Sequence, residues 1–380
     1  MNIIRLLKWS LLLFTTALLA PNLVANNPDK VSLKMNGRLF IDGGLYMNSP
    51  ATLTNKTHLS DVRIGAKLKY QNWYTKVDVG FANKKVSLKD AFIQYNIKNN
   101  YLRGGYMLGF FSLDQSASSN DYIFNTGSPI AETFYPGRHT GLSYTYSTNA
   151  LYASTGAFLG NELVTDTQTE AGYSYTARAV WRPHHTVGDI IHIGGGFQYK
   201  VPDKNIETGL RPLELVNKGG TYIPAPALNS IAFANTEYQT QANIECLIQQ
   251  NRWFVQGEYI WMNIQQEAIK SAYLAQGGYI QGGYLLKGTT YGYDMLDAVA
   301  IKPISPNSIL LACRFNYTNL NSNKTKQYGG DQKDITLGVN YYFNRYLSSR
   351  LNYSHLWLDE YSLFGKCQIN QIQIRLQAQF

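Results

Sequence analysis

Cysteine is scarce in this sequence, with three residues in 380. Cys246, Cys313 and Cys367 are odd in number and widely spaced, and they include no CxxC pair. The pattern predicts neither a disulfide framework nor a cysteine-based metal site. We interpret all three cysteines as structural.

Long hydrophobic runs and internal linkers are missing from residues 26–380. Hydrophobic residues make up 44% of the sequence, yet no segment in this range approaches the roughly 20 apolar residues of a membrane-spanning helix. No proline-, glycine- and serine-rich run, block of like charge or low-complexity tract divides the chain. We therefore expect one domain over residues 26–380.

The one long apolar run lies at the start of the chain. Arg5 and Lys8 precede the apolar stretch 9–20, and small residues follow near Ala25. A basic region, a short apolar core and a small-residue exit are typical of a secretory signal peptide, which we expect to span residues 1–25. A membrane-anchoring helix is the alternative interpretation of this run.

Tyrosine and glycine are abundant, with 29 and 32 residues, and they occur in short segments of alternating polarity. Successive side chains of a strand point to opposite faces, so this alternation indicates one apolar and one wet face. It is visible at 31–42, 62–69, 73–81, 173–182 and 238–248. The last segment has an apolar face and a polar face. The apolar face carries Ile372, Ile374, Leu376, Ala378 and Phe380, and the polar face carries Gln373, Arg375, Gln377 and Gln379.

Counting such segments gives about sixteen strands, and bacterial single-chain barrels have an even number. The expected strands are 31–46, 60–70, 73–82, 88–96, 101–109, 139–147, 150–159, 171–182, 190–200, 238–249, 252–262, 273–286, 308–318, 333–343, 347–357 and 368–380. The predicted fold class is all-β, a transmembrane antiparallel β-barrel. A soluble sandwich also alternates, but it would not end in an export-directed strand with a terminal aromatic residue.

The connections are expected to alternate between short turns at one end and long loops at the other. Short turns are predicted at 71–72, 147–149 and 344–346, and long loops at 47–59, 110–138, 201–237 and 321–332. Residues 287–307 contain an apolar stretch, but counting it as a strand would break the even number. We assign this segment to a long periplasmic connection.

Aromatic residues near strand ends are expected to form two girdles at the membrane interfaces. The candidates are Tyr46, Trp73, Tyr95, Tyr101, Trp181, Trp253, Trp261 and Trp357.

Five segments resemble, in order, those of one known family. They are Leu88–Tyr95, Gly105–Asp114, Tyr279–Gly288, Leu337–Asn344 with the following Leu351–Tyr353, and Arg375–Phe380. The fourth is similar to an L-G-x-N-W-Y-x-N turn and the last to an R-x-Q-x-x-F ending. Together they resemble the phosphate-selective porins O and P over most of residues 26–380.

This resemblance implies a trimeric outer-membrane porin with sixteen strands and an inward-folded third loop. The loop corresponds to residues 110–138, and the residues expected to face the solute path are Asp114, Asp121, Glu132 and Arg138. A mobile surface loop is the alternative interpretation. The resemblance also implies that the terminal Phe380 is a signal for the barrel-insertion machinery.

One motif departs from the family. Leu108 and Phe110 stand where the family carries a lysine and a proline. We therefore expect no specific selectivity for phosphate.

Positive charge dominates the predicted wet faces. The formal charge is +9, and it falls to +7 without Arg5 and Lys8. The predicted pore-lining residues are Lys34, Arg38, Arg63, Lys67, Lys76, Arg103, Arg178, Arg252, Arg314, Arg350 and Arg375. Fixed charges on a lumen wall attract counter-ions, so these residues indicate an anion path. They could equally be water-facing residues that are neutralised across strands.

No catalytic or cofactor-binding pattern occurs. His139 and Ser143 are too far apart along one strand to share a hydrogen bond. The pair His184-His185 lacks a third ligand at suitable spacing. We predict no enzyme activity, no metal and no cofactor, and the dispersed cations indicate no nucleic-acid binding.

The sequence thus predicts an outer-membrane porin of a Gram-negative bacterium. It would pass small hydrophilic solutes with a general preference for anions, embedded in outer-membrane lipid as a homotrimer. Two alternatives remain: a channel for uncharged solutes such as oligosaccharides, and a plugged barrel with a structural or adhesive role.

Overall fold

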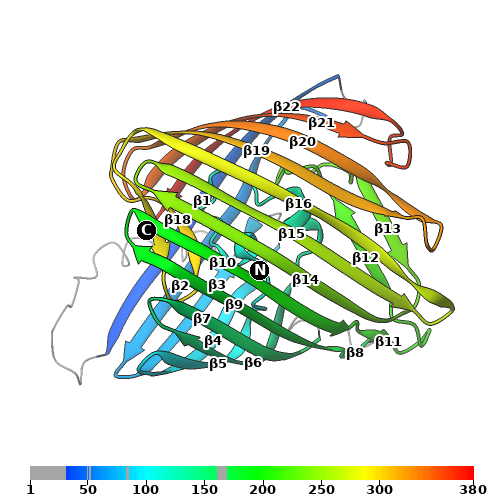
Figure 1. Cartoon of the computed structure of the whole chain (residues 1–380), viewed down its shortest axis with the longest axis horizontal. Coiled ribbons are helices and arrows are strands. Elements are labelled where there is room, and N and C mark those ends of the chain that lie inside the picture. Colours follow the sequence, from blue (N-terminus) through cyan, green and yellow to red (C-terminus); the bar gives the residue numbers. More distant parts are fainter. Residues whose placement is uncertain (1–30, 49, 51–52, 83–84, 161–168) are drawn as a thin grey trace, which may run out of the picture.

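Sixteen strands form one closed antiparallel barrel in the computed structural model, in which β1 pairs with β22 (Figure 1). The structure describes residues 31–48, 50, 53–82, 85–160 and 169–380, and the predicted signal peptide lies outside these ranges. The barrel strands are β1 (Ser32–Met47), β2 (Lys56–Tyr70), β3 (Trp73–Gly80), β4 (Ser87–Ile97), β5 (Asn100–Leu108), β6 (Arg138–Ser147), β7 (Leu151–Leu159), β9 (Tyr173–Thr186), β10 (Asp189–Val201), β14 (Thr236–Gln250), β15 (Trp253–Gln266), β16 (Ile269–Lys287), β19 (Ser308–Ser322), β20 (Gln327–Tyr342), β21 (Leu347–Leu358) and β22 (Cys367–Gln379). Each overlaps one predicted strand, so the predicted fold is confirmed.

The faces of the strands are inverted relative to a water-soluble protein. On β22, Ile374 and Leu376 point outward and are 49% and 52% exposed, whereas Arg375 between them is 0% exposed. An apolar outer face of this kind is stable only against lipid. No helix among the described residues is long and apolar enough to cross a membrane.

The two ends of the barrel differ in their connections. One end carries short turns such as 71–72, 98–99 and 251–252, together with the beginning of β1 and the end of β22. This is the periplasmic end, because short turns face the periplasm and long loops the exterior. The long loop predicted at 321–332 is wrong: alternation continues through both flanking strands, and the turn spans only residues 323–326.

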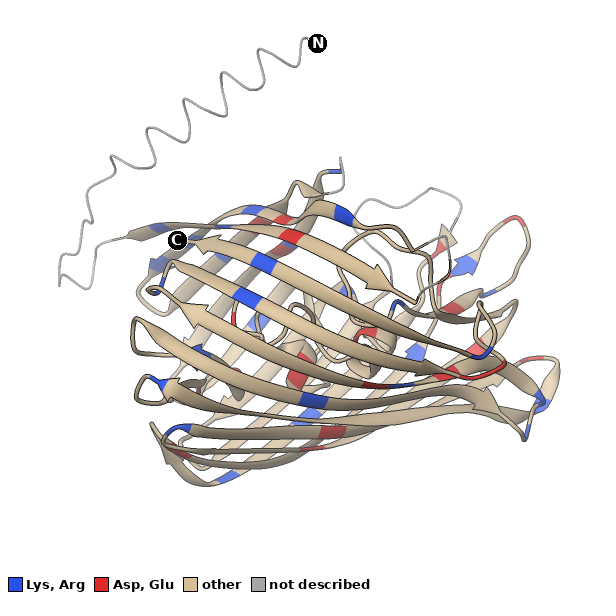
Figure 2. Ribbon diagram, turned by 90° about the horizontal axis from the view of Figure 1, so that it is seen from above, with Lys and Arg blue, Asp and Glu red and all other residues tan. Residues whose placement is uncertain are grey.

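Three segments fold into the barrel and pack against its inner wall. Figure 2 shows short helices and loops between the walls of the barrel. Loop L3 (residues 109–137) carries the short helices α2 (Leu113–Ser116) and α3 (Pro129–Thr133). Loop L5 (residues 202–235) carries β11 (Lys204–Asn205), which pairs with β8 (Thr169–Glu170), and the hairpin of β12 (Leu213–Asn217) and β13 (Asn229–Phe233). The lumenal hairpin (residues 288–307) is formed by β17 (Tyr291–Asp294) and β18 (Val299–Pro303).

The inward-folded third loop is therefore confirmed. The segment predicted as a periplasmic connection does leave from the periplasmic end, but it turns inward. Its apolar Val299 belongs to the same buried cluster as Leu113 of loop L3 and Leu247 of β14. Burial of these side chains holds the lumenal hairpin inside the barrel.

Candidate functional site: a cation-lined lumenal passage

Loop L3 is fixed to β15 by the carboxylate of Glu258. This carboxylate accepts hydrogen bonds from Ser112 Oγ at 3.0 Å and from the backbone N–H groups of Leu113 and Asp114, both at 2.9 Å. The first turn of α2 thereby finds acceptors for backbone donors that a helix leaves unpaired. Loop L3 is held against this side of the wall.

Arginines of β19 and β21 hold the next part of loop L3. Arg350 donates to the backbone oxygens of Phe124 at 3.3 Å and Asn120 at 3.0 Å. Arg314 donates to the backbone oxygen of Thr126 at 3.3 Å. Both guanidinium groups are buried and are used to position the loop.

Arg178 on β9 holds the lumenal hairpin in the same way. Its Nε lies 2.8 Å from Glu245, and its two terminal nitrogens donate to the backbone oxygens of Asp297 at 3.0 Å and Ala298 at 2.8 Å. The ion pair is completely buried. The side chain faces the lumen, but the hairpin covers it.

Loop L5 closes over loop L3 and β22. Tyr222 donates to the Glu132 carboxylate of α3 at 2.9 Å. Gln371 and Gln373 of β22 donate to the backbone oxygens of Gly219 at 3.0 Å and Gly220 at 3.2 Å. The tip of L5 is thereby fixed inside the barrel.

A cavity of about 1450 Å³ remains between these inserts and the β1–β5 side of the wall. It reaches from the periplasmic end, at Ser32 and Phe380, to loop L3 and the tip of L5. The charged residues that line it from β1–β5 are Lys34, Arg38, Asp61, Arg63, Lys67, Lys69, Lys76, Asp78, Asp90 and Arg103.

Three lysines form a row across β1, β2 and β3 on the wall of this cavity. Lys34 is paired in register with Lys67, and Lys67 with Lys76. Like charges directly opposite each other destabilise a sheet. Within the described part of the chain, Lys76 forms ion pairs, whereas neither Lys34 nor Lys67 has a carboxylate within ion-pair distance. This lysine row therefore leaves positive charge facing the cavity.

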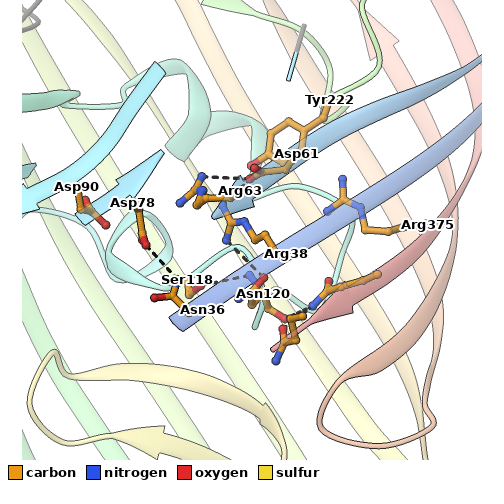
Figure 3. Close-up of polar contacts among 12 residues, drawn as sticks. Asn36, Arg38, Asp61, Arg63, Asp78, Asp90, Ser118, Asn120, Tyr222 and Arg375 are labelled. Carbon is orange, nitrogen blue, oxygen red and sulfur yellow. Dashed lines mark hydrogen bonds and ion pairs between the residues drawn. The ribbon is translucent and has the colours of Figure 1, made fainter. Parts of the chain in front are cut away.

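The next rung, by which we mean a row of residues paired in register across neighbouring strands, contains Asp78 and Asp90 and is nearly neutral. Lys76 lies 3.1 Å from Asp78 and 2.6 Å from Asp90, and Arg138 lies 3.1 Å from Asp90. Asn36 also donates to Asp78, at 3.0 Å (Figure 3). Both carboxylates are thus compensated and add little negative potential.

Arg38 and Arg63 form the rung above, opposite each other on β1 and β2. They share one carboxylate, Asp61, at 2.5 Å and 3.1 Å (Figure 3). Arg38 also donates to Asn120 of loop L3, at 3.4 Å. Two guanidinium groups against one carboxylate leave a net positive charge where loop L3 approaches the wall.

Arg103 on β5 is more constrained. It donates to Gln94 at 3.0 Å and 2.9 Å, lies over the ring of Phe92 at 4.3 Å and is 3.8 Å from Asp297 of the lumenal hairpin. Stacking and a fixed acceptor hold this guanidinium group at the cavity wall.

Acidic groups of loop L3 have raised pKa values. Burial raises the pKa of Glu132 to about 7, while the hydrogen bond from Tyr222 lowers it and the nearby Asp114 raises it. Burial also raises the pKa values of Asp114 and Asp121. Glu132 therefore changes charge near neutral pH on the cavity wall.

The predicted pore-lining cations fall into two groups. Those that line the cavity are Lys34, Arg38, Arg63, Lys67, Lys76 and Arg103. Those outside its lining are Arg178, Arg252, Arg314, Arg350 and Arg375. Arg252 is exposed at the turn between β14 and β15, and the buried Arg375 pairs with Asp42 at 2.7 Å and 2.6 Å.

The predicted residues of loop L3 are also divided. Asp121, Glu132 and Arg138 line the cavity. Asp114 is buried inside the loop and accepts a hydrogen bond from the Ser128 N–H group at 2.6 Å. Phe380 lies at the periplasmic mouth of the cavity and exchanges backbone hydrogen bonds with Gly37 at 3.1 Å and 3.0 Å.

Asp61 and Asp297 belong to this site but were not among the residues predicted from the sequence. Asp61 has the same parity along β2 as Arg63 and Lys67, so strand alternation could have placed it on the inner face. Asp297 offered no such signal, because it belongs to the lumenal hairpin.

The model of the family "phosphate-selective porin O and P" matches residues 34–380. A search of curated proteins finds no match.

Solved outer-membrane porins share the fold. The outer-membrane-expressed OmpT of Vibrio cholerae is 12% identical, with a TM-score of 0.62 over 94% of this chain and 99% of that one. An anion-selective porin from Comamonas acidovorans is 11% identical, with a TM-score of 0.63 over 92% and 100%. OmpF of Salmonella typhi, in complex with daunomycin, is 12% identical, with a TM-score of 0.58 over 94% and 99%. Likeness at this level of identity concerns the fold.

Proposed function

Because the chain belongs to the phosphate-selective porin O and P family and is therefore an outer-membrane porin, we propose that its solutes pass between loop L3 and the β1–β5 wall, and that this passage prefers anions. The observation that carries the proposal is the lysine row. Lys34 and Lys67 face the cavity without a carboxylate partner in the described structure, and Lys76 continues the row. Such fixed charge raises the local concentration of anions and repels cations.

A reversal potential measured under a KCl gradient across a planar bilayer tests this preference. We expect the sign of an anion-selective channel, weakening at high salt because the screening length falls from about 10 Å at 0.1 M to about 3 Å at 1 M. A cation-selective sign would contradict the proposal. Absence of conductance would instead indicate a plugged barrel.

The preference is proposed to be general rather than specific for phosphate. Leu108 lines the cavity at the position where the related motif has a lysine, and Phe110 lines it nearby. Neither side chain can donate a hydrogen bond to a phosphate oxygen. Added phosphate should therefore block chloride current only weakly, and strong block at low phosphate concentration would show a dedicated phosphate site.

We also propose that the protein is a homotrimer.

We further propose that Phe380 helps the barrel-insertion machinery to recognise the protein. The Phe380 side chain is 55% exposed, so a partner can reach it. Deleting Phe380 should lower the amount of protein in the outer membrane and increase periplasmic degradation. Unchanged outer-membrane levels and unchanged heat-modifiable mobility would reject this role.

A further inference from the structure

A second concave site lies on the outer, lipid-facing wall, away from the lumen. It is a crevice of about 400 Å³ over β15, β16, β19 and β20, which lie side by side in the barrel (Figure 1). The outward-facing side chains that line it are Tyr259, Ile280, Phe315, Tyr317 and Lys333. It thus combines apolar and aromatic walls with one cation.

Gly278 creates the depression. It faces outward between Tyr259 on β15 and Tyr317 on β19, to which it is paired in register. A Cβ atom here would lie 2.7 Å from the backbone oxygen of Glu258 and 2.9 Å from the Tyr259 ring. A side chain at position 278 would therefore collide with the wall of the crevice, and glycine leaves it open.

The depth of the crevice in the membrane follows from strand register. The rung that contains it is aromatic and continues from Tyr317 through Lys333 to Trp357. The next outward-facing rung toward the long loops begins at Trp261 on β15 and is polar on β16, β19 and β20, where it consists of Gln276, Asn319 and Asp331. The next rung toward the periplasm is apolar: Ile280, Phe315 and Ile335. A belt of aromatic residues between apolar and polar rungs marks the interface with the lipid headgroups, here in the outer leaflet.

Lys333 is the one feature of this rung that an ordinary aromatic girdle does not need. Its Nζ lies 5.8 Å from the centre of the Tyr317 ring, and no carboxylate of the described residues is within ion-pair distance. Asp331, on the same face, is one rung further out. A lysine on this face costs little near the interface and can extend toward the headgroups.

From this arrangement we propose that the crevice binds a phosphorylated glycolipid of the outer leaflet. Lys333 contacts a phosphate group, the tyrosine rings border the sugar, and an acyl chain lies over Ile280 and Phe315. Charge complementarity selects this occupant, because a neutral lipid would leave the ammonium group without a partner. The site is separate from the solute passage and does not depend on its ion preference.

Native mass spectrometry of the purified protein with bis-phosphorylated lipid A tests the proposal. Lys333→Gln removes the cation, and Lys324→Gln is a matched control that removes an exposed lysine from the nearby turn. A lysine near a membrane surface contributes enough to make binding about fivefold weaker when it is lost. We expect that loss in Lys333→Gln, wild-type binding in Lys324→Gln and tighter binding in Asp331→Asn.

Dephosphorylated lipid A separates the charge from the apolar contacts. It should bind the wild type and Lys333→Gln equally. Equal binding of the bis-phosphorylated lipid to both proteins would overturn the proposal. A change in the number of protomers in Lys333→Gln, without a change in lipid binding, would also overturn it and assign this face to a second copy of the chain.

Discussion

Two parts of the lumenal wall carry inward-facing cations, and the cations have different roles in the two parts. On the part of the wall that runs from β9 to β22, Arg178, Arg314 and Arg350 donate to backbone oxygens of the lumenal hairpin and loop L3. On the β1–β5 side, Lys34 and Lys67 face the cavity. The planar guanidinium group suits several fixed acceptors, whereas the ammonium group is a compact, well-hydrated charge. A charge that faces the lumen is therefore a pore charge only where no other segment covers it.

The largest expected difference between the two sides is in stability. Arg375→Met would leave Asp42 buried without its ion-pair partner. The side chains of Arg375 and Asp42 are 0% and 1% exposed. Removing one partner of a buried pair costs about 3–5 kcal/mol. Lys34→Met removes an exposed charge without a described partner and should not change stability measurably. Urea unfolding of both variants in detergent provides the comparison; equal losses would contradict it.

A second effect concerns the position of loop L3. Glu258→Ala removes the acceptor of three hydrogen bonds from the loop. The loop should loosen, so single-channel recordings should show larger and noisier conductance. Asp61→Ala, a carboxylate change on the open wall, should alter selectivity with little added noise. If Glu258→Ala conducts quietly at the wild-type level, Glu258 does not set the width of the passage.

A smaller effect on stability and anion selectivity is expected from a change in pH, through the carboxyl group of Glu132. Burial raises the pKa of Glu132 to about 7 from 4.5. A carboxyl group with a raised pKa stabilises the fold fully below pH 4.5, and this contribution is lost as the pH rises through about 7. Ionisation also adds negative charge to the cavity.

Both thermal stability and anion selectivity should therefore fall between pH 6 and about pH 8. Glu132→Gln keeps the hydrogen-bond acceptor for Tyr222 but cannot ionise, so it should flatten both dependences. If the wild-type slope persists in this variant, another group is responsible; Asp114, Tyr222 and Arg314 are its charged or titratable neighbours.

The barrel could be predicted because lipid imposes a constraint on every second residue. The alternation of Ile374 and Leu376 with Arg375 is a local pattern that requires no knowledge of the rest of the chain. The family motifs added the inward course of loop L3. The true ends of β19 and β20, near residues 321–332, were missed because the outward-facing residues at the exterior ends of these strands are polar. They lack the apolar alternation that marks the membrane-spanning part of a strand.

The division of the lumenal wall into a part covered by inserted segments and an open part could not be predicted from the same pattern. Arg314 and Arg63 both face inward on strands in which apolar and polar residues alternate. Nothing in their neighbours along the chain distinguishes a covered wall from an open one. Coverage depends on long-range contacts, such as Val299 of the lumenal hairpin packing in the same cluster as Leu113. The apolar stretch at residues 299–301 was visible, but its partners were not.

We propose that the open β1–β5 wall determines ion preference, and this is tested by removing positive charge from that wall. The variant Lys34→Gln/Lys67→Gln/Lys69→Gln removes three lysines from the cavity wall. The matched control, Lys324→Gln/Lys326→Gln/Lys366→Gln, removes three exposed lysines from connections at the exterior end. Reversal potentials under the same KCl gradient should show a loss of most anion selectivity in the first variant and wild-type selectivity in the second. Equal potentials in the two variants would contradict the claim.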